Sequence, residues 1–363
     1  MARYRKGGGV EGHSSSMVCS IMSDAIVLEA LRKVYPPPSG RPGRGPSVRR
    51  GGQMPFVADD ALADASGEIV ALDVLDLTVR DGELFGLLGP NGAGKSTTIG
   101  ILTTRIMPTS GRARVAGYDV VEAPHRVRQH IGVVPQRPNP DRNLSTIENL
   151  AFHAAYFGMP FDQAERSGRA LLERLGIADK ADAKVDELSG GQQQRLMIAR
   201  ALIHEPTVIF LDEPTVGLDP QARLDLWEIL RDLHAQGRTI IMTTHYMEEA
   251  DQLCDRIGIV DRGCLLACDT PAGLKARAPG GTLIEVSLDG PAAETITQAQ
   301  HVAGVTRVEA HGTALQAYSP RGGEVIPGLI AAASAAGRTV TDIHLTSPSL
   351  ESLFISMTGR KLK

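Results

Sequence analysis

A glycine-rich loop that ends in a lysine and a hydroxyl side chain could bind the phosphate groups of a nucleotide. Residues 89–96 read GPNGAGKS, which fits the pattern G-x-x-x-x-G-K-[ST]. The apolar residues 84–88 before the loop predict a buried strand, and residues 96–102 after it can begin a helix. Glycines let backbone N–H groups surround phosphate oxygens, and a helix N-terminus adds partial positive charge. The predicted phosphate-binding residues are Gly89, Pro90, Asn91, Gly92, Ala93, Gly94, Lys95, Ser96 and Thr97.

Two adjacent carboxylates follow the apolar strand predicted at residues 207–211. Asp212, at the strand tip beside the phosphate loop, can hold Mg²⁺ through water, and the Ser96 hydroxyl can ligate the same ion. Glu213 points elsewhere and can polarise a water molecule that attacks the γ-phosphate, while Lys95 reaches the outer phosphates. An ordinary acidic turn is the alternative interpretation of the two acids.

Three further polar residues follow predicted strands or turns near these acids. Gln136 comes after the strand at 131–134, and its uncharged amide can bond to Mg²⁺ or to the attacking water. A lone histidine is most often structural, but His245 ends a strand that should lie beside the one bearing Glu213, which favours contact with the γ-phosphate. Asp219 lies in a turn after the acids and could bridge two subunits. The predicted catalytic residues are Lys95, Gln136, Glu213 and His245.

A second helix end is also suited to phosphate. In the segment LSGGQQQR at 188–195, Ser189 is a good N-cap, and Gly190 and Gly191 leave the start of the helix bare before Gln192. An ordinary helix cap is the alternative. Because one nucleotide needs only one such helix end, the second is predicted to serve a nucleotide that another copy holds. This geometry predicts a head-to-tail dimer with two ATP molecules between the subunits.

The composition predicts a cytoplasmic protein with one large and one smaller domain. The 363 residues are 42% hydrophobic with a net charge of −4, and one Trp and seven Phe leave little material for a base-stacking surface. No apolar run approaches the roughly 18–20 residues that span a bilayer, and the N-terminus lacks the apolar core of a signal peptide. The four cysteines agree with a reducing compartment, and no second Cys/His pair accompanies Cys264 and Cys268 to make a metal site.

Changes in composition and periodicity divide the chain. Residues 1–24 are predicted to be disordered, and the Pro-, Gly- and Arg-rich residues 36–67 are predicted to be a flexible insertion between two strands. A basic contact to lipid headgroups or nucleic acid is the alternative for this insertion. Residues 141–188 have helical periodicity and predict a helical subdomain. Residues 282–363 predict a small ferredoxin-like α+β domain that ends in a helix at 349–359.

Near-continuous apolar strands alternate with helices, which predicts an α/β fold with a parallel sheet covered on both faces. These strands are expected at residues 84–88, 131–134, 207–211, 239–243 and 257–260. An alternating strand at 69–79 is instead typical of an antiparallel sheet.

Taken in their order along the chain, the motifs resemble those of the ATP-binding cassette family. The matching segments are GPNGAGKST, the Gln136 loop, LSGGQQQR, FLDEPTVGLDP and TTHYMEEA, and LSGGQ is specific to that family among phosphate-loop proteins. The resemblance covers about residues 25–276 and implies a P-loop cassette with a mixed sheet, an antiparallel β subdomain and a helical subdomain. It also implies that Tyr35 stacks on adenine, although about thirty residues intervene where the family has a short connection.

The resemblance assigns a role to each matching residue. Residues 89–96 become the Walker A motif, Gln136 the Q-loop residue and His245 the switch histidine. Asp212 and Glu213 become the Walker B pair. The signature and the D-loop then comprise Ser189, Gly190, Gly191, Gln192 and Asp219.

The C-terminal domain, with PSLESLF at 348–354, resembles the daunorubicin-resistance type of exporter ATPase. This implies a subunit that binds ATP and Mg²⁺, pairs with a second copy and lies on the inner face of the membrane. A separate transmembrane permease subunit of the ABC-2 type would export a drug, lipid or other amphipathic compound, with no nucleic acid as partner. The alternative is a soluble cassette ATPase acting on nucleic acid or ribosomes, whose usual tandem cassettes, coiled-coil insertion or zinc-binding cysteine pairs are missing from this sequence. A third possibility is that the C-terminal domain binds a drug or regulator.

Overall fold

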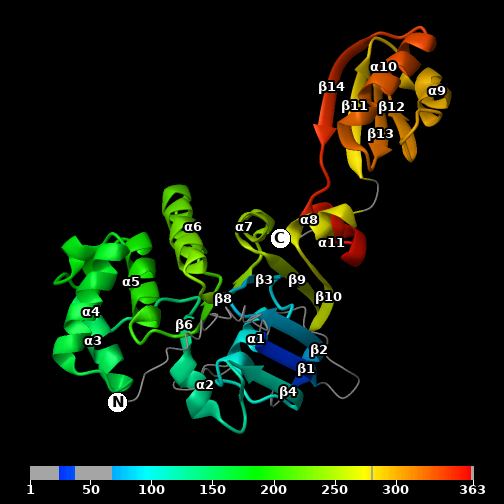
Figure 1. Cartoon of the computed structure of the whole chain (residues 1–363). Helices are drawn as coiled ribbons and strands as arrows, with labels where there is room; N and C mark the ends of the chain where they lie inside the picture. Colours follow the sequence, from blue (N-terminus) through cyan, green and yellow to red (C-terminus); the bar gives the residue numbers. More distant parts are fainter. Residues whose placement is uncertain (1–23, 37–67, 279–280, 361–363) are drawn as a thin grey trace, which may run out of the picture.

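The computed structural model describes residues 24–36, 68–278 and 281–360 (Figure 1). The disorder predicted for residues 1–24 and the insertion predicted for 36–67 fall almost wholly outside these ranges. Within the described residues, no helix is both long and apolar enough to cross a bilayer.

A six-stranded sheet forms the centre of the cassette. Its strands follow the order β10-β9-β3-β8-β7-β6, and all neighbours are parallel except β10, which pairs antiparallel with β9. The sequence correctly predicted five of these strands as apolar segments. The strands are β3 Leu84–Leu88, β6 Ile131–Val134, β7 Val208–Asp212, β8 Thr239–Thr244, β9 Arg256–Asp261 and β10 Cys264–Asp269.

Both faces of this sheet are buried, which explains why its strands are apolar at successive positions. Along β3, Leu84 and Leu88 belong to one hydrophobic core, and Phe85 and Leu87 belong to another on the opposite face. The first core includes side chains of α5 to α8 and of three further helices described below, and the second includes those of α1 and α2. These helices are α1 Lys95–Leu102, α2 Pro124–His130, α5 Gly190–Leu202, α6 Pro220–Ala235, α7 Met247–Leu253 and α8 Pro271–Ala276.

A four-stranded antiparallel sheet lies against the second core, with the order β2-β1-β4-β5. Its strands are β1 Asp24–Tyr35, β2 Ile69–Arg80, β4 Ser110–Val115 and β5 Tyr118–Asp119. The strands on either side of the predicted insertion pair with each other, and Tyr35 lies opposite Ile69. The insertion therefore joins two paired strands, and Tyr35 keeps its place at the end of β1.

The predicted helical subdomain is present between β6 and β7. It contains α3 Thr146–Tyr156, α4 Phe161–Arg174 and the short 3₁₀ turns η1 Ala178–Lys180 and η2 Val185–Glu187, before α5 begins. A capping box between Ser145 and Glu148 fixes the start of α3. Helix α4 approaches α3 closely because Gly168 has no side chain, since an added Cβ would lie 2.7 Å from Ile147 Cδ1.

The C-terminal residues form a second, wholly antiparallel sheet with the order β12-β13-β11-β14. The sequence of elements matches the predicted ferredoxin-like order, and the sheet has its own small hydrophobic core. The elements are β11 Thr282–Leu288, η3 Ala292–Thr295, α9 Ile296–Gln300, β12 Arg307–His311, β13 Ala314–Ser319, η4 Gly322–Val325, α10 Ile326–Ala335 and β14 Val340–Thr346.

The last helix, α11 Leu350–Thr358, packs on the cassette and not on the C-terminal sheet. The sequence assigned it to the C-terminal domain, but its apolar residues Leu350, Leu353 and Phe354 lie in the first cassette core. In Figure 1 it lies beside α8, away from β11 to β14. Arg360 then pairs with Asp261 at the end of β9. The C-terminal sheet is therefore inserted between two segments that belong to the cassette.

We expect Phe354→Ala to lower the free energy of unfolding of the cassette by about 3–5 kcal/mol, because it leaves a cavity in a closed core. Phe354 is fully buried, whereas Met357 on the same helix is 39% exposed and is the matched control. Met357→Ala should cost less than about 1 kcal/mol. Denaturant unfolding of the full chain measures both, and equal stability of the two variants would show that α11 does not contribute to the cassette core.

Candidate nucleotide-binding and catalytic site

The site lies where the parallel strands end. The glycine-rich loop follows β3, Gln136 follows β6 by two residues, Asp212 and Glu213 lie at the end of β7, and His245 follows β8. Because these strands are parallel neighbours, their carboxyl ends meet at one edge of the sheet. The fold thus brings together residues that are up to 156 positions apart in the sequence.

Two glycines let the loop fold back on its surroundings. A Cβ at Gly89 would lie 2.2 Å from the backbone oxygen of Val260, and Gly94 has a left-handed φ of +104° directly before α1. A side chain at either position would force the loop away from β9 or strain the backbone. The two glycines therefore let the backbone N–H groups of the loop lie next to the start of α1.

Lys95 is 4% exposed, and its ammonium group makes three close contacts. Its Nζ donates hydrogen bonds to Gly89 O at 2.6 Å and Pro90 O at 3.1 Å, and lies 3.3 Å from Glu213 Oε1. Burial lowers the pKa of Lys95, and the Glu213 carboxylate acts in the opposite direction. The lysine is thereby fixed at the mouth of the loop, next to the predicted catalytic acid.

Glu213 contacts residues that end or follow the strands β6 and β8. Its Oε2 accepts a hydrogen bond from Gln136 Nε2 at 3.1 Å, and its side chain is only 6% exposed. His245 Nδ1 lies 3.3 Å from the same oxygen, although it forms no hydrogen bond of ordinary geometry with any described residue. Glu213 also has a left-handed φ of 48°, and the O and Oγ1 of Thr243 hold its backbone N–H.

Asp212 and Ser96 form an oxygen-rich pair suited to Mg²⁺. Ser96 Oγ donates to Asp212 Oδ1 at 3.3 Å, and Thr243 Oγ1 donates to the same oxygen at 2.6 Å. Burial raises the pKa of Asp212, while the Thr243 and Ser96 hydrogen bonds lower it. A hydroxyl and a carboxylate oxygen in contact are the hard ligands that Mg²⁺ takes beside a nucleotide, so these residues fit the ion.

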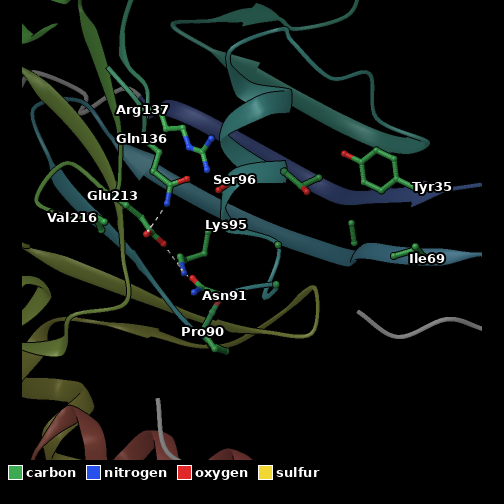
Figure 2. Close-up of a pocket in the computed structure, with 14 residues that line it drawn as sticks. Tyr35, Ile69, Pro90, Asn91, Lys95, Ser96, Gln136, Arg137, Glu213 and Val216 are labelled. Atoms are coloured by element: carbon green, nitrogen blue, oxygen red, sulfur yellow. Dashed lines mark hydrogen bonds and ion pairs between the residues drawn. The ribbon is translucent and has the colours of Figure 1, made fainter. Parts of the chain in front are cut away.

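A pocket of about 370 Å³ runs along the loop (Figure 2). Figure 2 shows Glu213 and Gln136 at one end of it and Tyr35 with Ile69 at the other. Burial raises the pKa of Tyr35, whose hydroxyl faces Thr97. An aromatic ring stands at one end and Glu213 at the other, so the pocket can take an elongated ligand with a flat group and a phosphate chain.

The described residues that line this pocket do not include the signature or Asp219. Ser189 and Gln192 form a capping box at the start of α5, and Gly190 is exposed, with open space in the described chain where a Cβ would lie. Asp219 caps α6 through the N–H of Ala222 at 2.9 Å. One copy therefore does not bring these residues to its own pocket.

Thr243 contacts both acids but is not among the site residues predicted from the sequence. Its signal was the pair of threonines that ends β8 after three apolar residues. Arg137 and Val216 also line the pocket and were not predicted as site residues. They follow Gln136 and Glu213 closely. Val216 has no polar side-chain atom, and Arg137, although its guanidinium could bind phosphate, belongs to no motif that marks it as a site residue.

This chain is similar to a known protein family and to curated relatives. A family model described as ABC transporter matches residues 72–216. The chain is 39% identical over 328 residues to the Nod factor export ATP-binding protein I of Ralstonia nicotianae, covering 88% of this chain and 98% of that one. It is 36% identical over 304 residues to the linearmycin resistance ATP-binding protein LnrL of Bacillus subtilis, covering 83% and 98%. Neither name supports a role on nucleic acid or ribosomes.

Solved structures have the same fold. The dimeric post-hydrolysis state of the ATP-binding cassette MJ0796, bound to ADP and Pi, matches with a TM-score of 0.55 and 25% identity over 68% of this chain and 98% of that one. CbiO1 of Clostridium perfringens, part of the ABC transporter complex cbiONQ, matches with a TM-score of 0.57 and 26% identity over 70% and 91%.

We expect Thr243→Val to move the acidic limb of the pH profile of ATP hydrolysis upward by about one pH unit. The change removes a hydrogen bond that lowers the pKa of Asp212, so that pKa rises further and protons compete with Mg²⁺ for the carboxylate at higher pH. Hydrolysis rates measured from pH 5 to 9 at several Mg²⁺ concentrations test this.

Thr239→Val is the matched control, because Thr239 is buried at the other end of β8 and accepts a hydrogen bond from Gly82 N. It should change stability without moving the pH profile. Identical pH profiles for the parent protein and Thr243→Val would exclude a role of Thr243 in ionising Asp212.

Proposed function

We propose that this chain, which belongs to the ABC transporter family, hydrolyses ATP to power export through separate membrane subunits. The observation that carries the proposal is the meeting of Lys95, Gln136, Glu213 and His245 at one edge of the parallel sheet. The export role is supported by the two relatives named above, both of which are aligned over nearly their full length.

Hydrolysis joins a water oxygen to the γ-phosphorus and breaks the bond from that phosphorus to the β–γ bridging oxygen, so ADP and phosphate leave. Glu213 takes the proton of the water, and Lys95 stabilises charge on the phosphate oxygens. Gln136 and His245 both lie within reach of Glu213 and can orient the water. Ser96 and Asp212, with Gln136, would hold Mg²⁺, which when bound neutralises charge on the phosphate oxygens.

The active unit in this proposal is a pair of copies with two ATP molecules between them. The helix end formed by Ser189, Gly190, Gly191 and Gln192 is accessible and lies outside the pocket of its own chain. In the pair, this helix end of each copy would complete the site of the other copy. Asp219, at the start of α6, would lie at the junction of the two chains. The similarity to a dimeric cassette structure supports this arrangement.

The membrane subunit would bind near the helical subdomain. Phe152 and Phe161 pack edge to face with ring centroids 5.2 Å apart, and they are 52% and 49% exposed. Tyr156, one turn along α3, is 80% exposed, so three aromatic rings form an apolar surface. We propose that this aromatic surface, with residues 137–140 after Gln136, receives the permease on the inner face of the membrane. The cargo would be a drug, lipid or other amphipathic compound.

We expect Glu213→Gln to lower the rate of ATP hydrolysis by about 10²–10⁴-fold, because the amide cannot accept the proton of the attacking water. ATP binding should persist, since the phosphates replace Glu213 as the anion beside Lys95, and the variant should accumulate as an ATP-bound dimer. Phosphate release and size-exclusion chromatography with ATP measure the two effects.

Glu228→Gln, on the exposed side of α6, is the control and should behave like the parent. Hydrolysis by Glu213→Gln at the parent rate would overturn the role assigned to Glu213. A variant that binds ATP but stays monomeric would instead contradict the two-copy site.

We expect Phe152→Ser combined with Tyr156→Ser to reduce membrane retention of the chain about tenfold, because two apolar contacts of a docking surface are lost. ATP binding by the purified chain should not change. The measurement is the fraction that sediments with membranes of cells that also produce the permease. Met107→Ser, on a 60% exposed residue before β4, is the control. Equal retention of all three proteins would place the permease elsewhere.

A further inference from the structure

Glu249 is a carboxylate buried in the cassette, away from the predicted catalytic groups. It lies on α7, four residues after His245, and is only 1% exposed. Burial raises its pKa, and a buried carboxyl group is costly unless polar partners surround it. None of the roles discussed above uses this side chain.

Its partners come from three different segments. Trp227, on α6, donates a hydrogen bond from Nε1 to Glu249 Oε1 at 3.3 Å. Thr244, at the end of β8, and Thr215, two residues after Glu213, both lower the pKa of Glu249 through their hydroxyl groups. Arg223, near the start of α6, contributes its positive charge in the same direction. Glu249 thus contacts the strand end that carries His245, the loop after Glu213 and the helix capped by Asp219.

One part of this cluster is not fully bonded. Glu249 Oε2 and Thr215 Oγ1 are both buried, and neither makes a hydrogen bond of ordinary geometry with a described residue. The Thr215 hydroxyl lowers the pKa of Glu249, but no hydrogen bond of ordinary geometry joins it to the carboxylate. Two buried polar atoms without a hydrogen bond are costly, so a hydrogen bond formed between Thr215 and Glu249 when residues 214–218 move would stabilise the displaced loop.

The same loop reaches the nucleotide pocket. Val216, the residue after Thr215, lines the pocket beside Glu213 and is 42% exposed. On the other side of Glu249, Arg223 lies over the ring of Tyr246, the residue after His245, at 4.9 Å from the ring centroid. The segment after β8 is therefore joined to α6 directly by Arg223 and Tyr246, and through Glu249 by its hydrogen bond from Trp227.

We propose that Glu249 is a positioning residue that couples the loop after Glu213, and with it the Asp219 end of α6, to the segment bearing His245. The inference rests on the proposed ATPase function and adds a role in its catalytic step. Glu249 reaches no part of the nucleotide pocket itself. It acts by keeping His245 and the Asp219 end of α6 in register when the loop moves.

The test compares Glu249→Gln, Thr215→Val and Glu248→Gln in the full chain. Gln at 249 keeps an oxygen for Trp227 but removes the charge and one acceptor, and Val at 215 removes the hydroxyl with little change in shape. We expect each of these two variants to lower kcat about tenfold while KM for ATP stays within about twofold. The combined variant should be no slower than the slower single variant, because both remove one contact. Glu248, exposed on the same helix, should tolerate the change to Gln.

Thermal unfolding and binding of a fluorescent ATP analogue are measured on every variant, so a loss of folding or of nucleotide binding is seen directly. A kcat within twofold of the parent in folded Glu249→Gln and Thr215→Val overturns the inference, as does a fully multiplicative effect in the combined variant. If the parent chain itself fails to hydrolyse ATP, the proposed function is wrong. The two failures are therefore distinguishable.

Discussion

The ion pair between Lys95 and Glu213 is the interaction on which the arrangement of the site depends. Its two side chains are 4% and 6% exposed, and the atoms lie 3.3 Å apart. Taking one such charge out of water without the other would cost several kcal/mol. Lys95 therefore requires Glu213 or another anion, and Glu213 requires Lys95 or another cation. Lys95 belongs to the helix after β3 and Glu213 to the end of β7, on either side of β8. The pair therefore fixes the loop and the acids relative to each other across three strands.

A nucleoside triphosphate in the loop would offer Lys95 more negative charge than the Glu213 carboxylate does. The lysine can then turn to phosphate without being left unpaired, and the carboxylate is released to Gln136 and His245, which lie 3.1 Å and 3.3 Å from its Oε2. The backbone of Glu213 cannot follow freely, because Thr243 holds its N–H through both O and Oγ1. In the proposed mechanism, one exchange of partners by Lys95 would link nucleotide binding to activation of Glu213.

Much of this site was predictable because parallel strands and their ends can be recognised from local sequence. The apolar runs before Gln136, Asp212 and His245 indicated buried strands, and the carboxyl ends of parallel strands must lie at one edge. The position of α11 was not predictable. Its spacing of Leu350, Leu353 and Phe354 indicates an apolar face, but periodicity does not say which core that face enters. The contacts of Thr243 and Glu249 depend on side-chain directions across neighbouring elements, which no local pattern specifies.

The helical subdomain is held to the Gln136 loop by a specific contact as well as by apolar packing. Arg200, in the last turn of α5, donates from Nη1 to the backbone oxygen of Asn139 at 3.1 Å and from Nη2 to its side chain. At its other end α5 starts with the signature, where Gly191 lies so close to α6 that an added Cβ would be 3.1 Å from Ala222 Cβ. One helix thus touches the Gln136 loop at one end and the Asp219-capped helix at the other. The aromatic surface proposed to receive the permease lies on α3 and α4, which both pack against α5. In that proposal, α5 is the element that would carry a force from this surface to the nucleotide site.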